Sequence, residues 1–140
     1  MSKAAVVFWS GTGNTEAMAD AVKAGAMEAG VEVSFFNASD FSAHMVDDFD
    51  AIAFGCPAMG DEVLEEDEFQ PMFDAVLPAL NGKKLALFGS YGWGDGQWMR
   101  DWEETCKATG VEFACDSVIA NESPDDEAVL ACKALGAALA

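Results

Sequence analysis

One short stretch of the chain has the residue types of a phosphate-binding loop. Residues 10–15 read Ser-Gly-Thr-Gly-Asn-Thr, follow an apolar run at residues 4–8, and lead into a helical pattern that begins at Asn14. At such a strand-to-helix junction, backbone N–H groups and the positive end of the helix dipole converge on an anion. The stretch contains no lysine or arginine, so a bound phosphate would be held by neutral donors alone.

Known phosphate-site motifs can be tested against this loop residue by residue. A Walker A loop needs a lysine after its last glycine, but Gly13 is followed by Asn14. A dinucleotide fingerprint needs a third glycine where Glu16 stands and an acidic residue where Asn37 stands. A phosphoacceptor receiver domain would need aspartates at the ends of the first and third strands, and neither position has one. When this loop is considered by itself, a plain strand-to-helix turn that binds no ligand is the remaining alternative. The hydroxyl and amide side chains of the loop disfavour it.

Two further loops carry side chains that suit a flat, partly apolar ligand. Residues 56–62 read Cys-Pro-Ala-Met-Gly-Asp-Glu and residues 90–96 read Ser-Tyr-Gly-Trp-Gly-Asp-Gly. The glycines beside Trp93 let the backbone approach a flat partner on which the indole stacks, although an isolated loop tryptophan more often only covers a sheet edge. Met59 is a mobile apolar cover in such a loop. Glu62 belongs to the acidic run 61–68, which is ordinarily solvated, but its position lets its carboxylate meet a ligand N–H.

These loops need a scaffold in which strands and helices alternate. Apolar and alternating runs predict five strands, at residues 4–8, 31–35, 51–55, 85–89 and 111–120. Helical spacing predicts helices over residues 14–29, 69–77 and 98–110, and a final helix capped by Ser123. The polar region 37–50 predicts a loop with a short helix. The alternation predicts an α/β fold with a doubly wound, five-stranded parallel sheet in one domain, residues 1–140.

The net charge of −18, from 25 acidic and 7 basic residues, limits the classes of partner. Nucleic acids and anionic membranes are excluded, because both are bound through basic surfaces. The acidic surface serves either solubility or steering towards basic partners, and composition does not choose between them. Four cysteines without paired spacing and a single histidine predict free thiols, no metal site and a cytoplasmic location. No apolar run is long enough to cross a bilayer.

The three loops together resemble those of the short-chain flavodoxins, a family of electron carriers with non-covalently bound FMN. Residues 10–15 are similar to that family's phosphate loop, and residues 59–62 and 90–96 are similar to its two flavin loops. The resemblance covers the whole chain and implies the strand order 2-1-3-4-5. The long-chain form carries an insertion within its last strand, and residues 111–120 leave no room for one.

The resemblance implies a role for each of these loops. The phosphate would be held by the side chains and backbone N–H groups of Ser10, Gly11, Thr12, Gly13, Asn14 and Thr15. Trp93 would stack on one face of the isoalloxazine ring, and Met59 would cover the other. The remaining residues of the expected FMN-binding set are Pro57, Ala58, Ser90, Tyr91, Gly92, Gly94 and Asp95, with Asn121 near the ribityl chain.

Two implied contacts would act on the reacting part of the flavin. The Glu62 carboxylate would accept a hydrogen bond from flavin N3–H. The Gly60–Asp61 peptide would flip on reduction, so that the Gly60 carbonyl accepts from N5–H, and glycine keeps that flip sterically cheap. The N5–H contact would stabilise the neutral semiquinone. An acidic, poorly hydrated environment would disfavour the anionic hydroquinone.

The resemblance therefore implies a low-potential one-electron carrier that cycles mainly between semiquinone and hydroquinone, and not an enzyme. Its partners would be redox enzymes with basic docking patches, such as ferredoxin- or flavodoxin-type reductases and their acceptors, and we expect a monomer. The alternative is a flavodoxin-like FMN enzyme such as an NAD(P)H:quinone reductase, which usually needs additional chain to bind nicotinamide. A flavodoxin-like activator of a radical enzyme is a more remote alternative.

Overall fold

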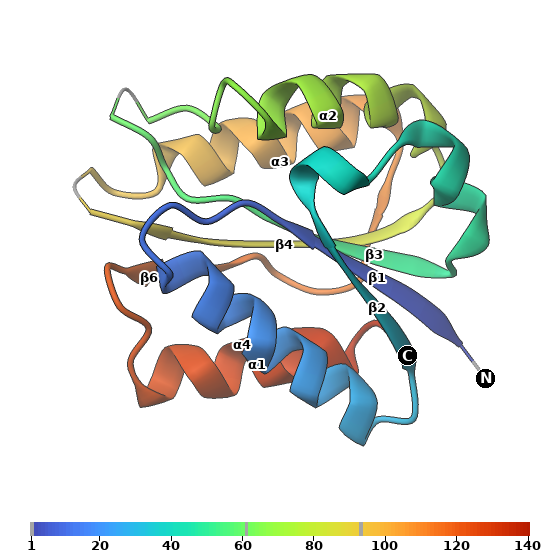
Figure 1. Cartoon of the computed structure of the whole chain (residues 1–140), viewed down its shortest axis with the longest axis horizontal. Coiled ribbons are helices and arrows are strands. Elements are labelled where there is room, and N and C mark those ends of the chain that lie inside the picture. The colour runs from blue at the N-terminus through green and yellow to red at the C-terminus, as the bar shows by residue number, and fades with distance from the viewer. Residues whose placement is uncertain (1, 61, 93) are drawn as a thin grey trace.

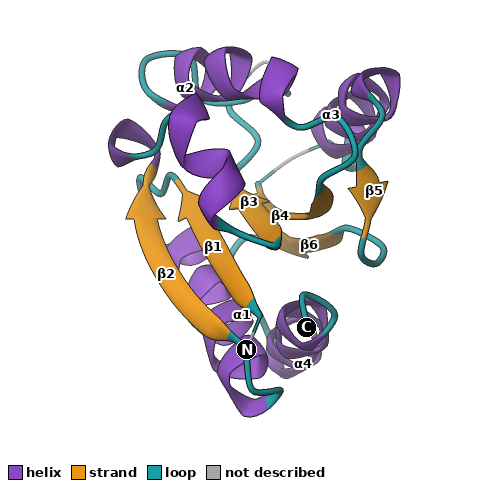
Figure 2. Ribbon diagram, turned by 90° about the vertical axis from the view of Figure 1, so that its right-hand side faces the viewer, coloured by secondary structure: helices purple, strands orange, loops and turns teal. Residues whose placement is uncertain are grey.

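A parallel β-sheet forms the middle layer of the molecule (Figure 2). The computed structural model describes residues 2–60, 62–92 and 94–140. The strands are β1 (Lys3–Phe8), β2 (Glu32–Asn37), β3 (Ala51–Gly55), β4 (Lys84–Tyr91), β5 (Glu112–Phe113) and β6 (Val118–Asn121). They follow the order β2-β1-β3-β4-β5, with β6 also paired with β4, and these pairings are parallel. The predicted α/β class and strand order are confirmed.

Helices cover both faces of the sheet (Figure 1). One face is covered by α1 (Asn14–Glu28) and α4 (Asp126–Ala137), and the other by α2 (Phe69–Val76) and α3 (Gln97–Thr109). The second layer also contains the 3-10 helices η1 (Ala38–Asp40), η2 (Ala43–Asp48) and η3 (Leu77–Ala79). Within the described ranges, no helix combines the length and the apolar character that crossing a membrane requires.

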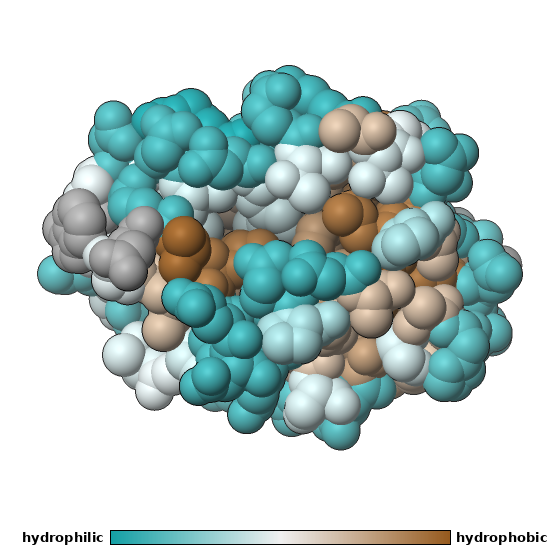
Figure 3. All heavy atoms as spheres, turned by 90° about the horizontal axis from the view of Figure 1, so that it is seen from above, coloured by the Kyte–Doolittle hydropathy of each residue, from teal (hydrophilic) through white to brown (hydrophobic). Residues whose placement is uncertain are grey.

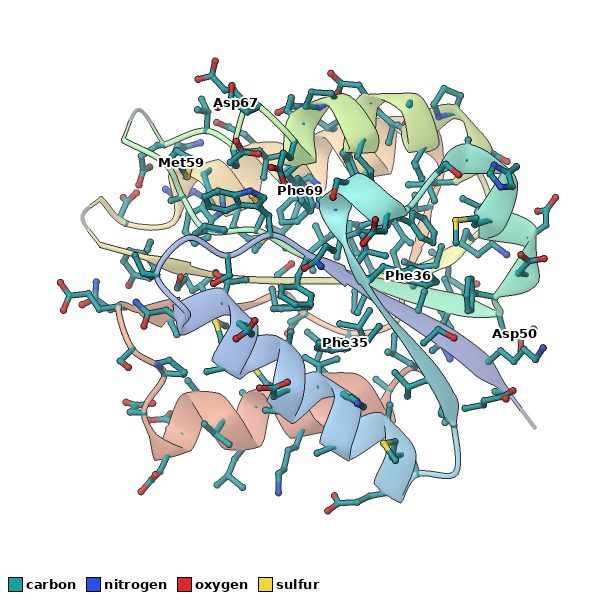
Figure 4. The ribbon with its side chains drawn as sticks, viewed as in Figure 1. Phe35, Phe36, Asp50, Met59, Asp67 and Phe69 are labelled. Atoms are coloured by element: carbon teal, nitrogen blue, oxygen red, sulfur yellow. The ribbon has the colours of Figure 1, made fainter. Side chains whose placement is uncertain are left out.

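Alternate strand residues face the two helical layers. In β1, Val6 packs in the cluster beneath α1 and α4, whereas Val7 packs in the cluster beneath α2 and α3. The edge strand β2 follows the same alternation (Figure 4): the Phe35 ring lies 4.9 Å from that of Phe8, and the Phe36 ring lies 5.3 Å from that of Phe41. This two-sided core fixes the strands, so the loops at their carboxyl ends start from rigid positions.

A glycine contact sets the position of α1. A Cβ atom added at Gly25 would collide with the carbonyl oxygen of Lys133 in α4, and one added at Gly136 would collide with that of Val22 in α1. Only residues without a side chain allow two helix backbones to approach so closely. The contact holds α1 against α4 and so fixes the helix that follows the predicted phosphate loop.

The prediction of one continuous strand over residues 111–120 is wrong. β5 pairs with the start of β4, β6 pairs with its end, and residues 114–117 separate the two. The intervening residues, Ala-Cys-Asp-Ser, lack the β-branched and aromatic side chains that favour strands. Ser117 Oγ instead donates to Glu103 Oε2 of α3 at 2.8 Å. The last strand position is therefore occupied by two short segments.

Two predicted element ends also differ from the structure. Ser123 is predicted to cap the last helix, but α4 begins at Asp126, and Asp125 Oδ1 accepts from the Ala128 N–H at 2.8 Å. Aspartate is a favoured N-cap, since its carboxylate satisfies an N–H that has no partner within the helix. β4 extends to Tyr91 beyond the predicted end at residue 89, because β6 pairs with these last residues.

Candidate functional site

A pocket opens at the carboxyl ends of β1, β3 and β4. Its volume is about 330 Å³, near the lower end of the range of roughly 300–1,000 Å³ for small-molecule sites. It is lined by Trp9, Gly11, Thr12, Asn14, Pro57, Ala58, Met59, Gly60, Ser90, Tyr91, Gly92 and Glu122. The fold thus brings together three loops that lie far apart in the sequence.

The first loop is stabilised by hydrogen bonds within itself. Ser10 Oγ accepts from the N–H groups of Gly13 at 3.1 Å and Glu16 at 3.3 Å. Gly13 has a φ of 95°, in the left-handed region that favours glycine, and this turns the chain into α1. Because the Ser10 oxygen acts only as an acceptor in these bonds, its hydroxyl hydrogen is available to an anion.

The first turn of α1 is open to a ligand. The N-cap, Gly13, supplies no side-chain bond, and the N–H groups of Asn14 and Thr15 have no hydrogen-bond partner among the described residues. N–H groups in this position are donors to anions at the positive end of the helix dipole. The Thr15 side chain is buried, and its Oγ1 lies 2.9 Å from Ser90 Oγ. Thr15 therefore offers its N–H, while its hydroxyl joins α1 to the end of β4.

The second loop contains a tight turn around Gly60. The Met59 N–H donates to Val63 O and the Glu62 N–H donates to Met59 O, both at 2.9 Å. A Cβ atom added at Gly60 would have no described atom within 4 Å. The turn is therefore closed by its own backbone and is not enclosed by neighbouring side chains. The second half of the peptide predicted to flip, Asp61, lies outside the described residues.

Glu62 lines a different cavity from the rest of its loop. This second cavity has a volume of about 150 Å³ and lies between the loop, α2 and α3. The Glu62 carboxylate lies against Gly94 of the third loop, and its Oε1 is buried without a hydrogen-bond partner among the described residues. Its proposed partner, flavin N3–H, stays a prediction.

Glu65 is a structural residue of the site that the sequence pattern does not reveal. The acidic run 61–68 is predicted to be solvated, and for Glu65 this is wrong, because its side chain is only 4% exposed. Its carboxylate accepts from the N–H groups at the start of α2, which are those of Asp67 at 2.8 Å, Glu68 at 2.7 Å and Phe69 at 2.8 Å. Burial by itself raises the pKa of Glu65, but these backbone bonds together outweigh it and lower the pKa below 4.5. An acidic residue shortly before an apolar helix start is the signal that could have found it.

The third loop is tied to α3 and β6. Arg100 of α3 donates to Asp95 Oδ1 at 2.9 Å and to Asp95 O at 3.1 Å. Asn121 Nδ2 donates to Gly92 O at 3.5 Å, so Asn121 supports this loop and does not line the pocket. Trp93, the predicted stacking residue, lies outside the described residues.

Trp9 and Glu122 line the pocket, although neither was predicted to do so. A Cβ atom added at Gly11 would lie 2.9 Å from the Trp9 ring, so the indole packs directly on the first loop. Glu122 follows β6, has a φ of 58°, and donates its N–H to Tyr91 O at 2.6 Å. The signal for both is their position, immediately after a strand that ends at the same edge of the sheet.

Among the described lining residues, Glu122 is the one with a carboxyl group, and the others are apolar residues, glycines and residues with hydroxyl or amide groups. They include no lysine or arginine, so an anion would meet only neutral donors. The thiol of Cys56, at the end of β3, is fully buried, and burial raises its pKa to about 12. It therefore stays protonated and supplies no nucleophile. The described site can hold an anion at one end and cover an apolar ring at the other.

Comparisons with known proteins agree with this architecture. The family model for flavodoxin matches residues 6–135. The flavodoxin of Clostridium beijerinckii is 47% identical over 121 residues, which cover 86% of this chain and 88% of that protein. The flavodoxin of Megasphaera elsdenii is 45% identical over 135 residues, which cover 96% of each chain. The solution structure of two-electron reduced Megasphaera elsdenii flavodoxin has a TM-score of 0.89 at 44% identity, with 97% of both chains covered.

Proposed function

The chain belongs to the flavodoxin family, and from this premise we propose that it is a low-potential one-electron carrier. It is an electron-transfer protein, and its cofactor is FMN. We propose that the bound flavin cycles mainly between the neutral semiquinone and the hydroquinone. The proposal is carried by one observation: the open first turn of α1 lies at the same pocket as two apolar, glycine-containing loops.

The first loop fits the phosphate of FMN. The N–H groups of Asn14 and Thr15 are unpaired among the described residues, and the Ser10 hydroxyl has a hydrogen to donate. Thr12 and Asn14 line the pocket with side chains that can add further bonds. A phosphate held by such donors keeps its negative charge, because no basic side chain in residues 10–15 neutralises it. The loop therefore supplies affinity without adding positive charge to the site.

The other end of the pocket fits the isoalloxazine ring. Residues 57–59 line one wall and Tyr91 and Gly92 line another. When bound, FMN supplies the one-electron chemistry that these side chains lack. Met59 would cover one face of the ring and Trp93 the other, and Glu62 would accept from N3–H. The open surroundings of Gly60 support the proposal that its carbonyl turns towards N5–H on reduction.

The low potential follows from charge and hydration. The protein carries a net charge of −18, and the described lining of the pocket offers no cation. A further negative charge on a ring covered by Met59 would lose much of its contact with water and would meet an acidic environment. These residues therefore disfavour the last electron, and the reduced protein would be a strong donor. Nothing in the described lining favours the alternative of a nicotinamide-dependent reductase.

The acidic surface supports docking on basic partners. Figure 3 shows a face on which hydrophilic side chains surround smaller hydrophobic patches. We propose that the protein acts as a cytoplasmic monomer and meets redox enzymes through electrostatic attraction to their basic patches. Attraction of this kind weakens as salt shortens the screening length. The rate of electron transfer to a basic partner should therefore fall as ionic strength rises. An unchanged rate would show that the acidic surface serves solubility and not docking.

A spectral redox titration tests the proposed function. The protein loaded with FMN is reduced stepwise under anaerobic conditions while its visible absorption is recorded. We expect a blue intermediate at one electron per flavin, followed by bleaching only at a clearly lower potential. Direct conversion from the yellow to the bleached form in a single two-electron step would contradict the proposal.

A further inference from the structure

The second cavity contains two buried polar groups that lack partners. Trp102 of α3 is only 3% exposed, and its indole Nε1 has no hydrogen-bond partner among the described residues. Glu62 Oε1 is likewise buried and unpaired within that part of the chain. Both side chains line the same cavity of about 150 Å³. One of these groups can only donate a hydrogen bond, and the other, as a carboxylate, can only accept.

Trp98, one turn earlier on the same helix, provides an internal comparison. Its Nε1–H donates to the carbonyl oxygen of Cys56 at 3.2 Å, as expected for a buried indole. The Trp102 ring makes edge contacts with two phenyl rings, and its centroid lies 5.5 Å from that of Phe69 and 5.6 Å from that of Phe73. Trp102 lines the second cavity, and its Nε1 is buried without the backbone partner that Trp98 has, among the described residues.

Water has the chemistry that this cavity requires. A buried donor or acceptor without a partner is costly, and a water molecule can accept from the indole while donating to the carboxylate. One water needs roughly 10–15 Å³ of such volume, so a cavity of about 150 Å³ has room for several. Thr105 and Gln70 also line it; the Thr105 hydroxyl donates to Asp101 O at 3.1 Å and keeps acceptor capacity for a second partner.

We propose that ordered water in the second cavity bridges Trp102 Nε1–H to Glu62 Oε1. Trp102 is thereby a positioning residue: it holds the Glu62 carboxylate, through water, in the orientation from which its other oxygen accepts from flavin N3–H. The bridge itself stands on the two unpaired groups and the cavity. Its effect on the flavin rests on the role given to Glu62 in the proposed function.

The bridge can be measured with and without FMN. In the FMN-free protein, water-selective NMR should show magnetisation transfer from long-lived water to the Trp102 indole proton. The Trp98 indole proton, which is bonded to a carbonyl, should show none. A high-resolution crystal structure of the FMN-loaded protein should contain a water oxygen within about 3.2 Å of Trp102 Nε1. A dry cavity, or a direct bond from Trp102 to Glu62, would overturn the proposal.

The positioning role needs a change that removes only the N–H group. Replacing Trp102 by β-(3-benzothienyl)alanine keeps the shape of the ring and substitutes sulfur for the donor. We expect the Kd for oxidised FMN to rise about threefold to tenfold, and the ¹⁵N3 resonance of labelled FMN to move as its hydrogen bond weakens. In a Glu62→Ala background, the same replacement should change the Kd by less than about twofold.

The outcomes separate the two proposals. An equal loss of affinity in both backgrounds would show that Trp102 does not act through Glu62 and would overturn the positioning role. If Glu62→Ala alone moves neither the Kd nor the N3 resonance, the N3–H role in the proposed function fails, and the positioning role fails with it. The bridging water is then still decided by the NMR and crystallographic measurements.

Discussion

Two helices follow loops at the ends of adjacent strands, and their first turns are completed in opposite ways. After β1, the N–H groups of Asn14, which lines the pocket, and of Thr15 have no hydrogen-bond partner among the described residues. After β3, the N–H groups at the start of α2 are taken by the buried carboxylate of Glu65. Both arrangements use the attraction between an anion and the positive end of a helix. In α2 the chain supplies the anion itself, whereas in α1 we propose that the phosphate of the cofactor supplies it.

Because their helix starts differ in this way, the first and second loops have different functions. The Glu65 bonds join the segment after the second loop to the start of α2, and Asp125 Oδ1 accepts in the same manner from an N–H in the first turn of α4. The first loop is held in shape by the hydrogen bonds to Ser10 Oγ, and its remaining N–H groups are available as hydrogen-bond donors. We infer that the first loop provides most of the affinity for the phosphate, while the second holds Gly60 beside the pocket.

The largest expected effect is on stability, from the substitution Glu65→Gln. It removes the charge from a buried carboxylate that holds three N–H groups. We expect a loss of about 2–3 kcal/mol in the free energy of unfolding, measured by urea denaturation of the FMN-free protein. The neighbouring substitution Glu66→Gln, at an exposed position, should change it by less than about 0.5 kcal/mol. Equal effects of the two substitutions on the free energy of unfolding would contradict the structural role of Glu65.

The second largest effect is expected on the affinity for FMN, from a substitution that places an acidic side chain near the start of α1. Thr12→Asp places a carboxylate beside the open N–H groups, where it competes with the phosphate and repels it. We expect the Kd for FMN to rise at least about tenfold, while Thr12→Asn, of similar size but neutral, changes it much less. Riboflavin has no phosphate, so its Kd should move by less than about twofold. An equal loss for both flavins would contradict the phosphate assignment.

A smaller effect is the pH dependence that Glu65 brings. Its pKa is lowered in the folded protein relative to the value of 4.5 expected in the unfolded chain. Its contribution to stability is therefore complete above about pH 4.5 and is lost as pH falls through the lower folded value. Urea denaturation between pH 7 and pH 3 should show the difference between wild type and Glu65→Gln shrinking only below about pH 4.5. A difference that stays constant over this range would contradict the linkage.

The smallest effect is expected at the turn of the second loop. An added methyl group at Gly60 has no described atom within 4 Å, so Gly60→Ala should leave the oxidised site intact. It restricts the backbone conformations open to the peptide, and we expect the maximal yield of semiquinone to fall about twofold to fivefold in a redox titration. An unchanged yield would remove the peptide flip from the proposed function.

Much of the fold could be predicted because its strongest signals are local. The apolar runs of β1 and β3 are fully buried, or nearly so, and runs of this kind are typical of central parallel strands. The break between β5 and β6 could not be predicted in the same way. It depends on pairing with the longer β4 and on the bond from Ser117 to Glu103, which only the folded chain brings together.

The residues of the candidate site also differ in how well they could be predicted from local sequence signals. Loops that directly follow predicted strands were found, because the carboxyl ends of parallel strands share one edge of the sheet. Glu65 was missed because the acidic run was interpreted as solvated, and the position of Glu65 shortly before an apolar helix start was not used as a signal. Glu122 was missed although it follows the end of the predicted strand 111–120, because a single glutamate after a strand is not distinguished by its residue type from the solvated acidic residues of the chain.

The contrast between the two helix starts can be tested directly with inorganic phosphate. The FMN-free protein, labelled with ¹⁵N, is titrated with phosphate at constant pH and ionic strength while its amide resonances are recorded. We expect the largest and saturable shifts at the N–H groups of Asn14 and Thr15, with those of Glu68 and Phe69 unchanged. Shifts of equal size at both helix starts, or none at α1, would contradict the claim that one is reserved for a ligand and the other is closed by Glu65.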